Sequence, residues 1–252
     1  MKNTTTQSRG SSLSRCVLAA FALVLAAYAF GAADQKADST HRPSLTDAEK
    51  QAGWRLLFDG TSPTGWRGLG MDGFPADLWK IQDGSLHCLG GSKSNDLVTV
   101  DEYQNFELSF EWMIPKLKGN SGVKYRVQEQ KGHGFAFGPE YQCMYDPGVV
   151  DKHATGSLYE LVAPTGKKLE PQGQFNTSRI LIRGNHGEHW LNGVKVAEFE
   201  FGSDALNAAI ARSKFKNTDW GKNPKGHIAL QDHHDEVFFR NIKIRELPAN
   251  EK

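Results

Sequence analysis

Cysteine is scarce in this chain of 252 residues, and its three copies form no CxxC pair and no cysteine–histidine cluster with zinc spacing. A structural zinc site is therefore not expected. Net charge is almost absent as well, because 30 basic residues stand against 29 acidic ones. A formal charge of +1 argues against nucleic acid or an anionic surface as the partner.

Several catalytic and architectural motifs are also missing. The sequence contains no internal repeat, no heptad pattern and no glycine-rich phosphate loop after a strand. It lacks the G-x-S-x-G elbow of serine hydrolases and the E-x-D-x-x-E run of sandwich glycosidases. The usual templates for hydrolysis therefore fit poorly.

The longest apolar run covers only fifteen residues, Cys16–Phe30, which is short for a membrane span. It follows Arg9 and Arg15 and precedes small residues, a pattern typical of a signal peptide; an uncleaved N-terminal anchor is the alternative. We expect an exported protein, periplasmic or secreted, with no stable membrane insertion after cleavage. The predicted organisation is a signal peptide at 1–33, a polar linker at 34–52, one domain at 53–248 and a tail at 249–252.

Outside that leader, Cys88 and Cys143 each occupy an apolar strand phase. An oxidising compartment would allow them to pair, whereas a buried free thiol is the simpler interpretation. The sequence leaves both open, and it does not indicate the oligomeric state.

Short alternating segments separated by turn signals dominate the chain from Gly53 onward. The clearest is Asn105–Ile114, where Phe106, Leu108, Phe110 and Trp112 alternate with polar residues. One helix is expected, Asp204–Lys214, capped by Ser203, and a helical turn at Thr46–Ala52. About a dozen such strands with few helices predict an antiparallel β-sandwich.

The C-terminal stretch Gly226–Leu247 is interpreted as a hairpin of two strands joined at His234-Asp235. The apolar phase slips within its second strand, which predicts a bulge near Arg240-Asn241. A similar slip in Val194–Phe201 predicts another bulge, after a type I′ turn at Asn192-Gly193.

Polar residues gather in the strand phase opposite the core. If the sheets curve, they would line a ligand groove, although each is also consistent with a solvated strand face. These residues are Lys124, Arg126 and Gln128, then Glu140 and Gln142, then Tyr159, then Gln231 and His233. His233 is a candidate for proton transfer because imidazole titrates near neutral pH, although a single histidine is commonly only a surface residue.

Nine ordered blocks of residues 53–247 resemble the 3-keto-disaccharide hydrolase domain. They are RLLFDGTSPTGWR, WKIQDGSLH, DLVTVDEYQNFELSFEW, GNSGVKYRV, GPEYQ, GSLYELVAP, RGNHGEHWLNGVKV, SKF and KGHIALQDHHDEVFFRNIKIREL. The chain departs from the family pattern at His234, where LQDHG is usual, and at Gly173–Asn176, where GEWN is common. The second departure removes a tryptophan and puts the substrate range in question.

The resemblance implies a concanavalin-like jelly-roll sandwich, exported by bacteria, that acts on an oligosaccharide or glycoside whose C3 hydroxyl is already oxidised to a ketone. The ketone acidifies the C2 proton, so a base can remove it while the aglycone leaves C1, and water then adds back. No cofactor is predicted, although a divalent cation could replace the basic residues as the electrophile.

The roles that this chemistry requires are assigned to residues of the polar clusters. The expected catalytic residues are His233 as base, Arg126 with Lys124 as enolate stabilisers, and Glu140 or Tyr159 as acid. The expected substrate-binding residues are Lys124, Gln142, Gln231 and His189. Three alternatives stay open: a non-catalytic carbohydrate-binding module, an ordinary sandwich glycosidase, and a structural or adhesion domain.

Overall fold

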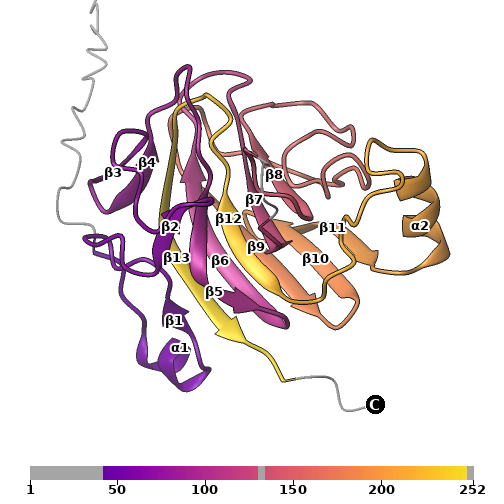
Figure 1. Ribbon diagram of the computed structural model, residues 1–252, viewed down its shortest axis with the longest axis horizontal. Coiled ribbons are helices and arrows are strands. Elements are labelled where there is room, and N and C mark those ends of the chain that lie inside the picture. The colour runs from indigo at the N-terminus through magenta and orange to yellow at the C-terminus, as the bar shows by residue number, and fades with distance from the viewer. Residues whose placement is uncertain (1–41, 130–133, 249–252) are drawn as a thin grey trace, which may run out of the picture. The chain divides into compact units, whose positions relative to one another are not determined.

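A computed structural model describes residues 42–129 and 134–248 of the chain. The expected signal peptide at 1–33 and the tail at 249–252 lie outside these described residues, as does the first part of the expected linker. Within the described ranges, all strand pairs are antiparallel and form two sheets (Figure 1). No helix among the described residues is long and apolar enough to cross a bilayer.

The larger sheet has eight strands in the order β11-β10-β9-β6-β13-β4-β3, and β1 pairs with β13 beside this path. Alternation works as expected in β6, where the four large apolar side chains are buried. The strands are β1 (Arg55–Leu56), β3 (Trp79–Gln82), β4 (Ser85–Cys88), β6 (Phe106–Met113), β9 (Asn176–Arg183), β10 (His186–Leu191), β11 (Val194–Glu200) and β13 (Val237–Glu246).

The smaller sheet has five strands in the order β2-β5-β12-β7-β8. These strands are β2 (Trp66–Gly68), β5 (Leu97–Tyr103), β7 (Asn120–Val127), β8 (Glu140–Met144) and β12 (Gly226–Leu230). The two inner faces meet through edge-to-face aromatic pairs, Phe106 with Tyr125 at 6.2 Å and Phe110 with Tyr141 at 5.6 Å between ring centroids. The expected antiparallel jelly-roll β-sandwich is thereby confirmed.

The prediction of a C-terminal hairpin is wrong. β12 lies between β5 and β7 of the small sheet, whereas β13 lies between β6 and β4 of the large sheet. The chain does reverse at His234, whose φ is 66°, but it crosses from one layer to the other as it does so. Local turn residues specify a reversal, and only long-range packing decides which strands pair.

The expected bulges and short turn are confirmed. The register shifts between Arg240 and Lys243, where Asn241 has φ 50°, and β11 shifts against β10 opposite His189 and Trp190. At the β10–β11 turn, Asn192 and Gly193 have φ values of 47° and 81°, as a type I′ turn requires.

Two helices flank the sandwich in the described residues. α1 (Asp47–Gln51) begins with a capping box from Thr46, in the stretch expected to form a helical turn. α2 (Asp204–Ala211) is capped by Ser203 as expected, but it ends three residues before Lys214. Lys214 and Phe215 therefore belong to the turn that follows the helix, which frees them to line a pocket. Cys88 and Cys143 are both buried free thiols, so they form no disulfide.

Candidate functional site

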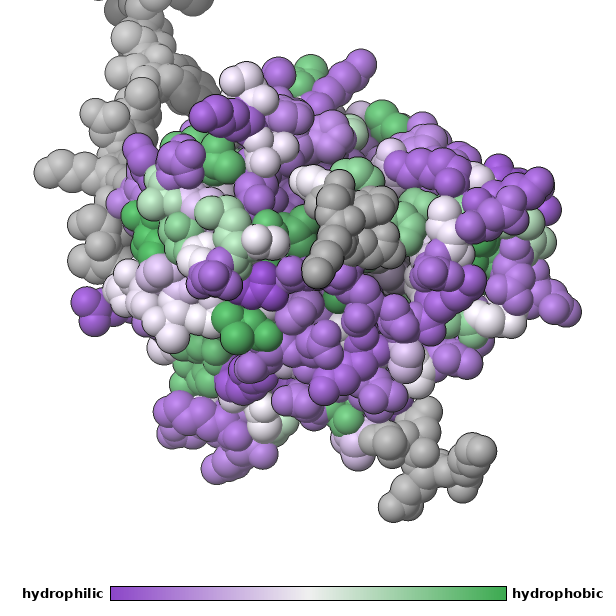
Figure 2. Space-filling view, viewed as in Figure 1, coloured by the Kyte–Doolittle hydropathy of each residue, from purple (hydrophilic) through white to green (hydrophobic). Residues whose placement is uncertain are grey.

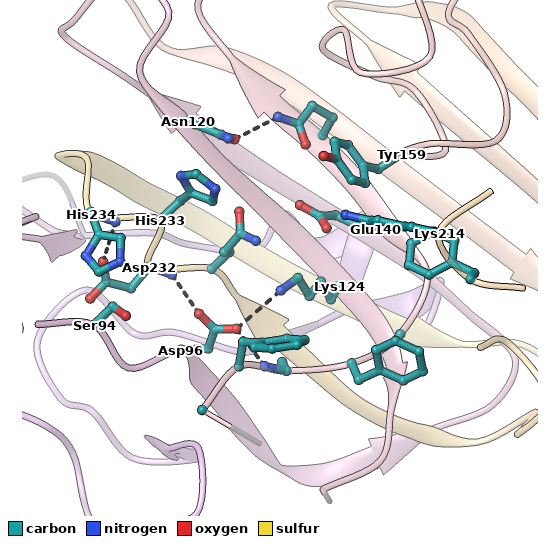
Figure 3. Close-up of a pocket in the computed structure, with 18 residues that line it drawn as sticks. Ser94, Asp96, Asn120, Lys124, Glu140, Tyr159, Lys214, Asp232, His233 and His234 are labelled. Carbon is teal, nitrogen blue, oxygen red and sulfur yellow. Dashed lines mark hydrogen bonds and ion pairs between the residues drawn. The ribbon is translucent and has the colours of Figure 1, made fainter. Parts of the chain in front are cut away.

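A pocket of about 550 Å³ lies on the outer face of the small sheet, over β7, β8 and the end of β12. Figure 3 shows polar side chains from these strands and from the surrounding loops pointing into it. On the space-filling surface, much of this face is covered by hydrophilic residues (Figure 2). The polar residues that line the pocket are Ser94, Asp96, Asn120, Lys124, Glu140, Gln142, Tyr159, Lys214, Gln231, Asp232, His233 and His234.

A buried ion pair forms one wall of the pocket. The ammonium of Lys124 lies 3.4 Å from Oδ2 of Asp96, and both side chains are almost fully buried. The same carboxylate accepts hydrogen bonds from the backbone N–H groups of Ala136 and Asp232, each at 2.9 Å. Asp96 thus joins β5, β7 and two loops at the pocket, and it holds a cation beside the cavity.

Glu140 offers a half-buried carboxylate that receives no hydrogen bond from any described residue. It lies over Gly122, where a Cβ atom would come within 2.2 Å of Oε1, so only glycine leaves room for it. Burial raises the pKa of this carboxyl group, although Lys124 opposes the effect. Glu140 can therefore hold a proton at a higher pH than an exposed glutamate can.

Two amide oxygens at the pocket are buried without a donor, Oε1 of Gln142 and Oε1 of Gln231. Gln142 donates through Nε2 to Oδ1 of Asn120 at 2.7 Å, which fixes its orientation and leaves its oxygen free. A buried acceptor without a donor costs about 1–3 kcal/mol. The hydroxyl groups of a ligand would satisfy both oxygens.

Tyr159 and Lys214 lie together at the pocket. The backbone N–H of Tyr159 donates to the carbonyl of Glu140 at 3.0 Å, and Lys214 Nζ lies 4.4 Å from the centroid of the tyrosine ring. Burial, and then the charges of Glu140 and Glu160, raise the pKa of the Tyr159 phenol. The phenol is thus a neutral donor near the carboxyl group of Glu140.

His233 is exposed and lines the pocket from the connection that crosses between the sheets. That connection is anchored by Asp232, whose Oδ1 accepts from the backbone N–H of His234 and whose Oδ2 accepts from that of Asn95. The imidazole of His233 has no hydrogen bond to a described residue, so both ring nitrogens are open to a ligand. Figure 3 shows it on the side of the hollow opposite Lys214.

Arg126 does not line this pocket, contrary to the expectation from alternation. β7 carries a bulge at Tyr125-Arg126, because Val127 pairs with His227 while Lys124 pairs with Ala229. Arg126 has φ 52°, and its guanidinium donates to the carbonyl of Gly184 and lies 4.0 Å from the centroid of the Phe201 ring. The bulge shifts the alternation, so Arg126 reaches toward the large sheet.

His189 does not line the pocket either. It is fully buried between the sheets, where its Nε2 lies 3.0 Å from the hydroxyl of Tyr125 and its Nδ1 lies 3.1 Å from the carbonyl of Gly156. Burial lowers its pKa to about 4, so the ring is neutral in the core. Sequence alone could have indicated this, because His189 shares a strand phase with Leu191.

The structure adds residues that sequence reasoning did not assign to the site, chiefly Asp96, Asn120 and Lys214. Asp96 precedes a buried strand without any local feature that marks it as part of a pocket. Lys214 was placed inside a helix, and only the early end of α2 brings it to the cavity. Of the eight expected site residues, six line the pocket: Lys124, Glu140, Gln142, Tyr159, Gln231 and His233.

A divalent cation would need several free oxygen or nitrogen ligands. In the pocket, Asp96 and Asp232 already accept backbone hydrogen bonds, which leaves Glu140 as a free carboxylate among the described residues. A close set of potential ligands occurs elsewhere in the described part of the chain, at His186, Glu188 and Glu198 on β10 and β11 of the large sheet. Among the described pocket residues, the groups left open to a cation are therefore the Glu140 carboxylate, the His233 imidazole and the two amide oxygens of Gln142 and Gln231.

The two antiparallel sheets place the chain in the class of jelly-roll β-sandwich proteins, with a polar pocket over the smaller sheet. Within that class, residues 53–245 match the model of the 3-keto-alpha-glucoside-1,2-lyase-like domain, and the chain belongs to this family. The chain is 30% identical over 230 residues to the 3-keto-disaccharide hydrolase of Bacteroides thetaiotaomicron, covering 77% of this chain and 79% of that protein.

Solved structures from Parabacteroides distasonis ATCC 8503 share the fold. One, described as a "putative glycosyl hydrolase", has a TM-score of 0.73 and 34% identity, and the match covers 82% of this chain and all of the other. A second with the same description has a TM-score of 0.58 and 26% identity over 77% of this chain and 99% of the other.

Proposed function

We propose that this protein cleaves 3-keto-glycosides, including 3-keto-disaccharides, by elimination across C1 and C2 followed by hydration. The observation that supports this most is the half-buried Glu140 carboxylate, which has no hydrogen-bond partner among the described residues, in one pocket with the ammonium of Lys124 and two unpartnered amide oxygens. A sugar supplies the hydroxyl donors that these acceptors lack. Family membership and the name of the B. thetaiotaomicron relative support the same substrate class.

The proposed reaction begins with loss of the C2 proton to His233. The electron pair of the C2–H bond moves toward C1 as the C1–O bond breaks, and negative charge develops on the C3 oxygen, where the Lys124 ammonium stabilises it. The leaving oxygen takes a proton from Glu140 or Tyr159. Water then adds across the C1–C2 double bond, with hydroxyl at C1 and hydrogen at C2, which gives net hydrolysis.

The environments of the residues support these roles. The raised pKa of Glu140 suits a proton donor, and the unpartnered imidazole of His233 suits a base. Gln142 and Gln231 are proposed to hold sugar hydroxyls. Arg126 and His189 have no part in this proposal, because their side chains are engaged away from the pocket.

The test compares an aryl 3-keto-glucoside with the corresponding aryl glucoside and follows the release of the phenol. We expect release from the keto sugar, little release from the parent sugar, and loss of release in a His233→Ala variant. Equal release from both sugars would instead indicate an ordinary glycosidase. Saturable sugar binding without release would indicate a binding module.

We further propose that the chain is exported, on the strength of the apolar run at Cys16–Phe30 and the small residues that follow it. Expression in a Gram-negative host, followed by fractionation and mass measurement, tests this. Export predicts a periplasmic or secreted form shorter by about 30 residues, the usual upper length of a signal peptide. Full-length protein that stays in the cytoplasm would contradict it.

A further inference from the structure

The direction of the Tyr159 ring is not set by its hydroxyl group, which has no hydrogen bond to a described residue. Its backbone is fixed to β8 through Glu140, so the contacts of the ring determine where the phenol points. Lys214 lies on the ring at 4.4 Å, and the imidazole of His153 lies 5.2 Å away between ring centroids. His153 does not line the pocket, and the pocket residue that its ring contacts is Tyr159.

His153 is held in place by Glu160, the residue that follows Tyr159. Its Nε2 lies 2.7 Å from Oε2 of Glu160, and its backbone N–H donates to Oδ1 of Asp151 at 2.8 Å. Although burial raises the pKa of Glu160, hydrogen bonds from Lys152 and His153 bring it below the ordinary value. The carboxylate of Glu160 is therefore well placed to hold the imidazole of His153.

The backbone at Glu160 adopts an uncommon conformation beside this contact. Its φ is 71°, in the left-handed region, and its N–H donates to the carbonyl of Lys152 at 2.9 Å. A non-glycine residue in this region is strained, and such conformations persist where surrounding contacts fix them. The turn lets Tyr159 face the pocket while the carboxylate of Glu160 reaches back to His153.

We propose that His153 and Glu160 are positioning residues that hold the Tyr159 phenol toward the substrate. The proposal rests on the proposed function, in which Tyr159 donates a proton or contacts the leaving group. Glu160 fixes the imidazole, the imidazole packs on the phenol ring, and the ring then presents its hydroxyl to the cavity. A misplacement of about 1 Å lowers turnover by up to about a hundredfold.

A double-mutant cycle on turnover of the 3-keto-glucoside tests this. We expect His153→Ala to lower kcat by about tenfold or more, with KM within about twofold, because the substrate still binds. In a Tyr159→Phe background the same substitution should cause no further loss. His186→Ala is the matched control, since His186 pairs with Glu188 on the other sheet and should leave kcat unchanged.

Two variants at Glu160 test whether the activity loss comes from a lost contact with His153 or from general misfolding. Glu160→Gln keeps an oxygen that can accept from His153 and should retain most activity, whereas Glu160→Ala should match His153→Ala. Losses from His153→Ala and Tyr159→Phe that multiply would overturn the proposal.

If the wild-type protein does not turn over the keto sugar, the proposed function fails, and Tyr159 ionisation still tests the positioning. Wild-type minus Tyr159→Phe difference absorbance gives its titration midpoint. His153→Ala should lower that midpoint, because the ring becomes more solvated. An unchanged midpoint would overturn the positioning role.

Discussion

Lys124 and Asp96 form an ion pair at the pocket in which neither side chain is more than 5% exposed. Removing one charge from a buried pair leaves the other uncompensated, which typically costs 3–5 kcal/mol, so Asp96→Asn should lower the free energy of unfolding by about that amount. Turnover should fall with it, because Lys124 loses its anchor. Urea denaturation and steady-state kinetics measure the two effects.

The pair of Lys50 and Asp47 on α1 provides the control, since these side chains are 61% and 91% exposed. Asp47→Asn should change the free energy of unfolding by less than about 1 kcal/mol, because solvent screens an exposed pair. Equal losses of unfolding free energy in Asp96→Asn and Asp47→Asn would show that the buried pair stabilises the protein no more than the exposed one.

Gly122 determines whether the Glu140 carboxylate fits over the sheet. Gly122→Ala would place a Cβ atom 2.2 Å from Oε1, so the carboxylate must move. We expect at least a tenfold loss of kcat with a stability loss of about 1–3 kcal/mol, the usual cost of overpacking. Gly73→Ala, where a Cβ meets nothing within 4 Å, is the control and should retain activity.

Glu140 should make stability depend on pH in a defined direction. Its folded-state pKa lies above the ordinary value, so the folded protein binds the proton more tightly than the unfolded chain does. The resulting penalty is absent at pH below the ordinary glutamate pKa, grows as pH rises toward the folded pKa, and is constant above it.

Glu140→Gln removes this penalty, so the variant should melt at a higher temperature than wild type near pH 8. The gap should disappear near pH 3, and turnover of the keto sugar should fall by about 10²–10⁴-fold if Glu140 is the acid. Calorimetry across this pH range provides the measurement. A variant that is less stable than wild type at pH 8 would contradict a raised pKa for Glu140 in the folded protein.

His189 should weaken the protein in acid. Its pKa falls from an ordinary 6.5 to about 4 in the core, so the unfolded chain binds the proton more tightly. Stability is full above pH 6.5 and is lost as pH falls toward 4, at about 1.4 kcal/mol for each pH unit, which gives about 3 kcal/mol.

A His189→Gln variant lacks this titration, so its free energy of unfolding should change less between pH 7 and pH 4 than that of wild type. Urea denaturation at several pH values measures the difference, and turnover at pH 7.5 reports whether the site survives. Parallel pH profiles for the two proteins would show that the ring is accessible to protons in the folded state.

Periodicity predicted much of the fold because most strands of this sandwich have one buried face. The bulge at Asn241 was predictable as well, since the apolar phase slips there and asparagine tolerates a positive φ. The bulge at Arg126 was not, because arginine gives no such signal and the residues around it are buried on both sides. The misplacement of Arg126 follows from that single shift.

Pairing across the two layers was the other limit. The turn residues look the same whether the next strand pairs with the previous one or enters the opposite sheet. The sequence therefore predicts a β12–β13 hairpin that the structure does not have. Asp96 and Lys214 were not predicted for a related reason. Asp96 lies just before β5 and Lys214 just after α2, and only tertiary packing brings them to the cavity. By contrast, Glu140, Gln142 and Gln231 were predictable, because they occupy the polar phase of strands or their ends.

The crossing of the chain between layers has a mechanical consequence. His233 is tethered to both sheets, through β12 on one side and β13 on the other, whereas Glu140 belongs to the small sheet alone. Any sliding of one layer over the other would therefore change the spacing of these two reactive groups. The aromatic pairs between the sheets, Phe106 with Tyr125 and Phe110 with Tyr141, oppose that sliding. The alignment of the reactive groups therefore depends on residues that never contact the ligand.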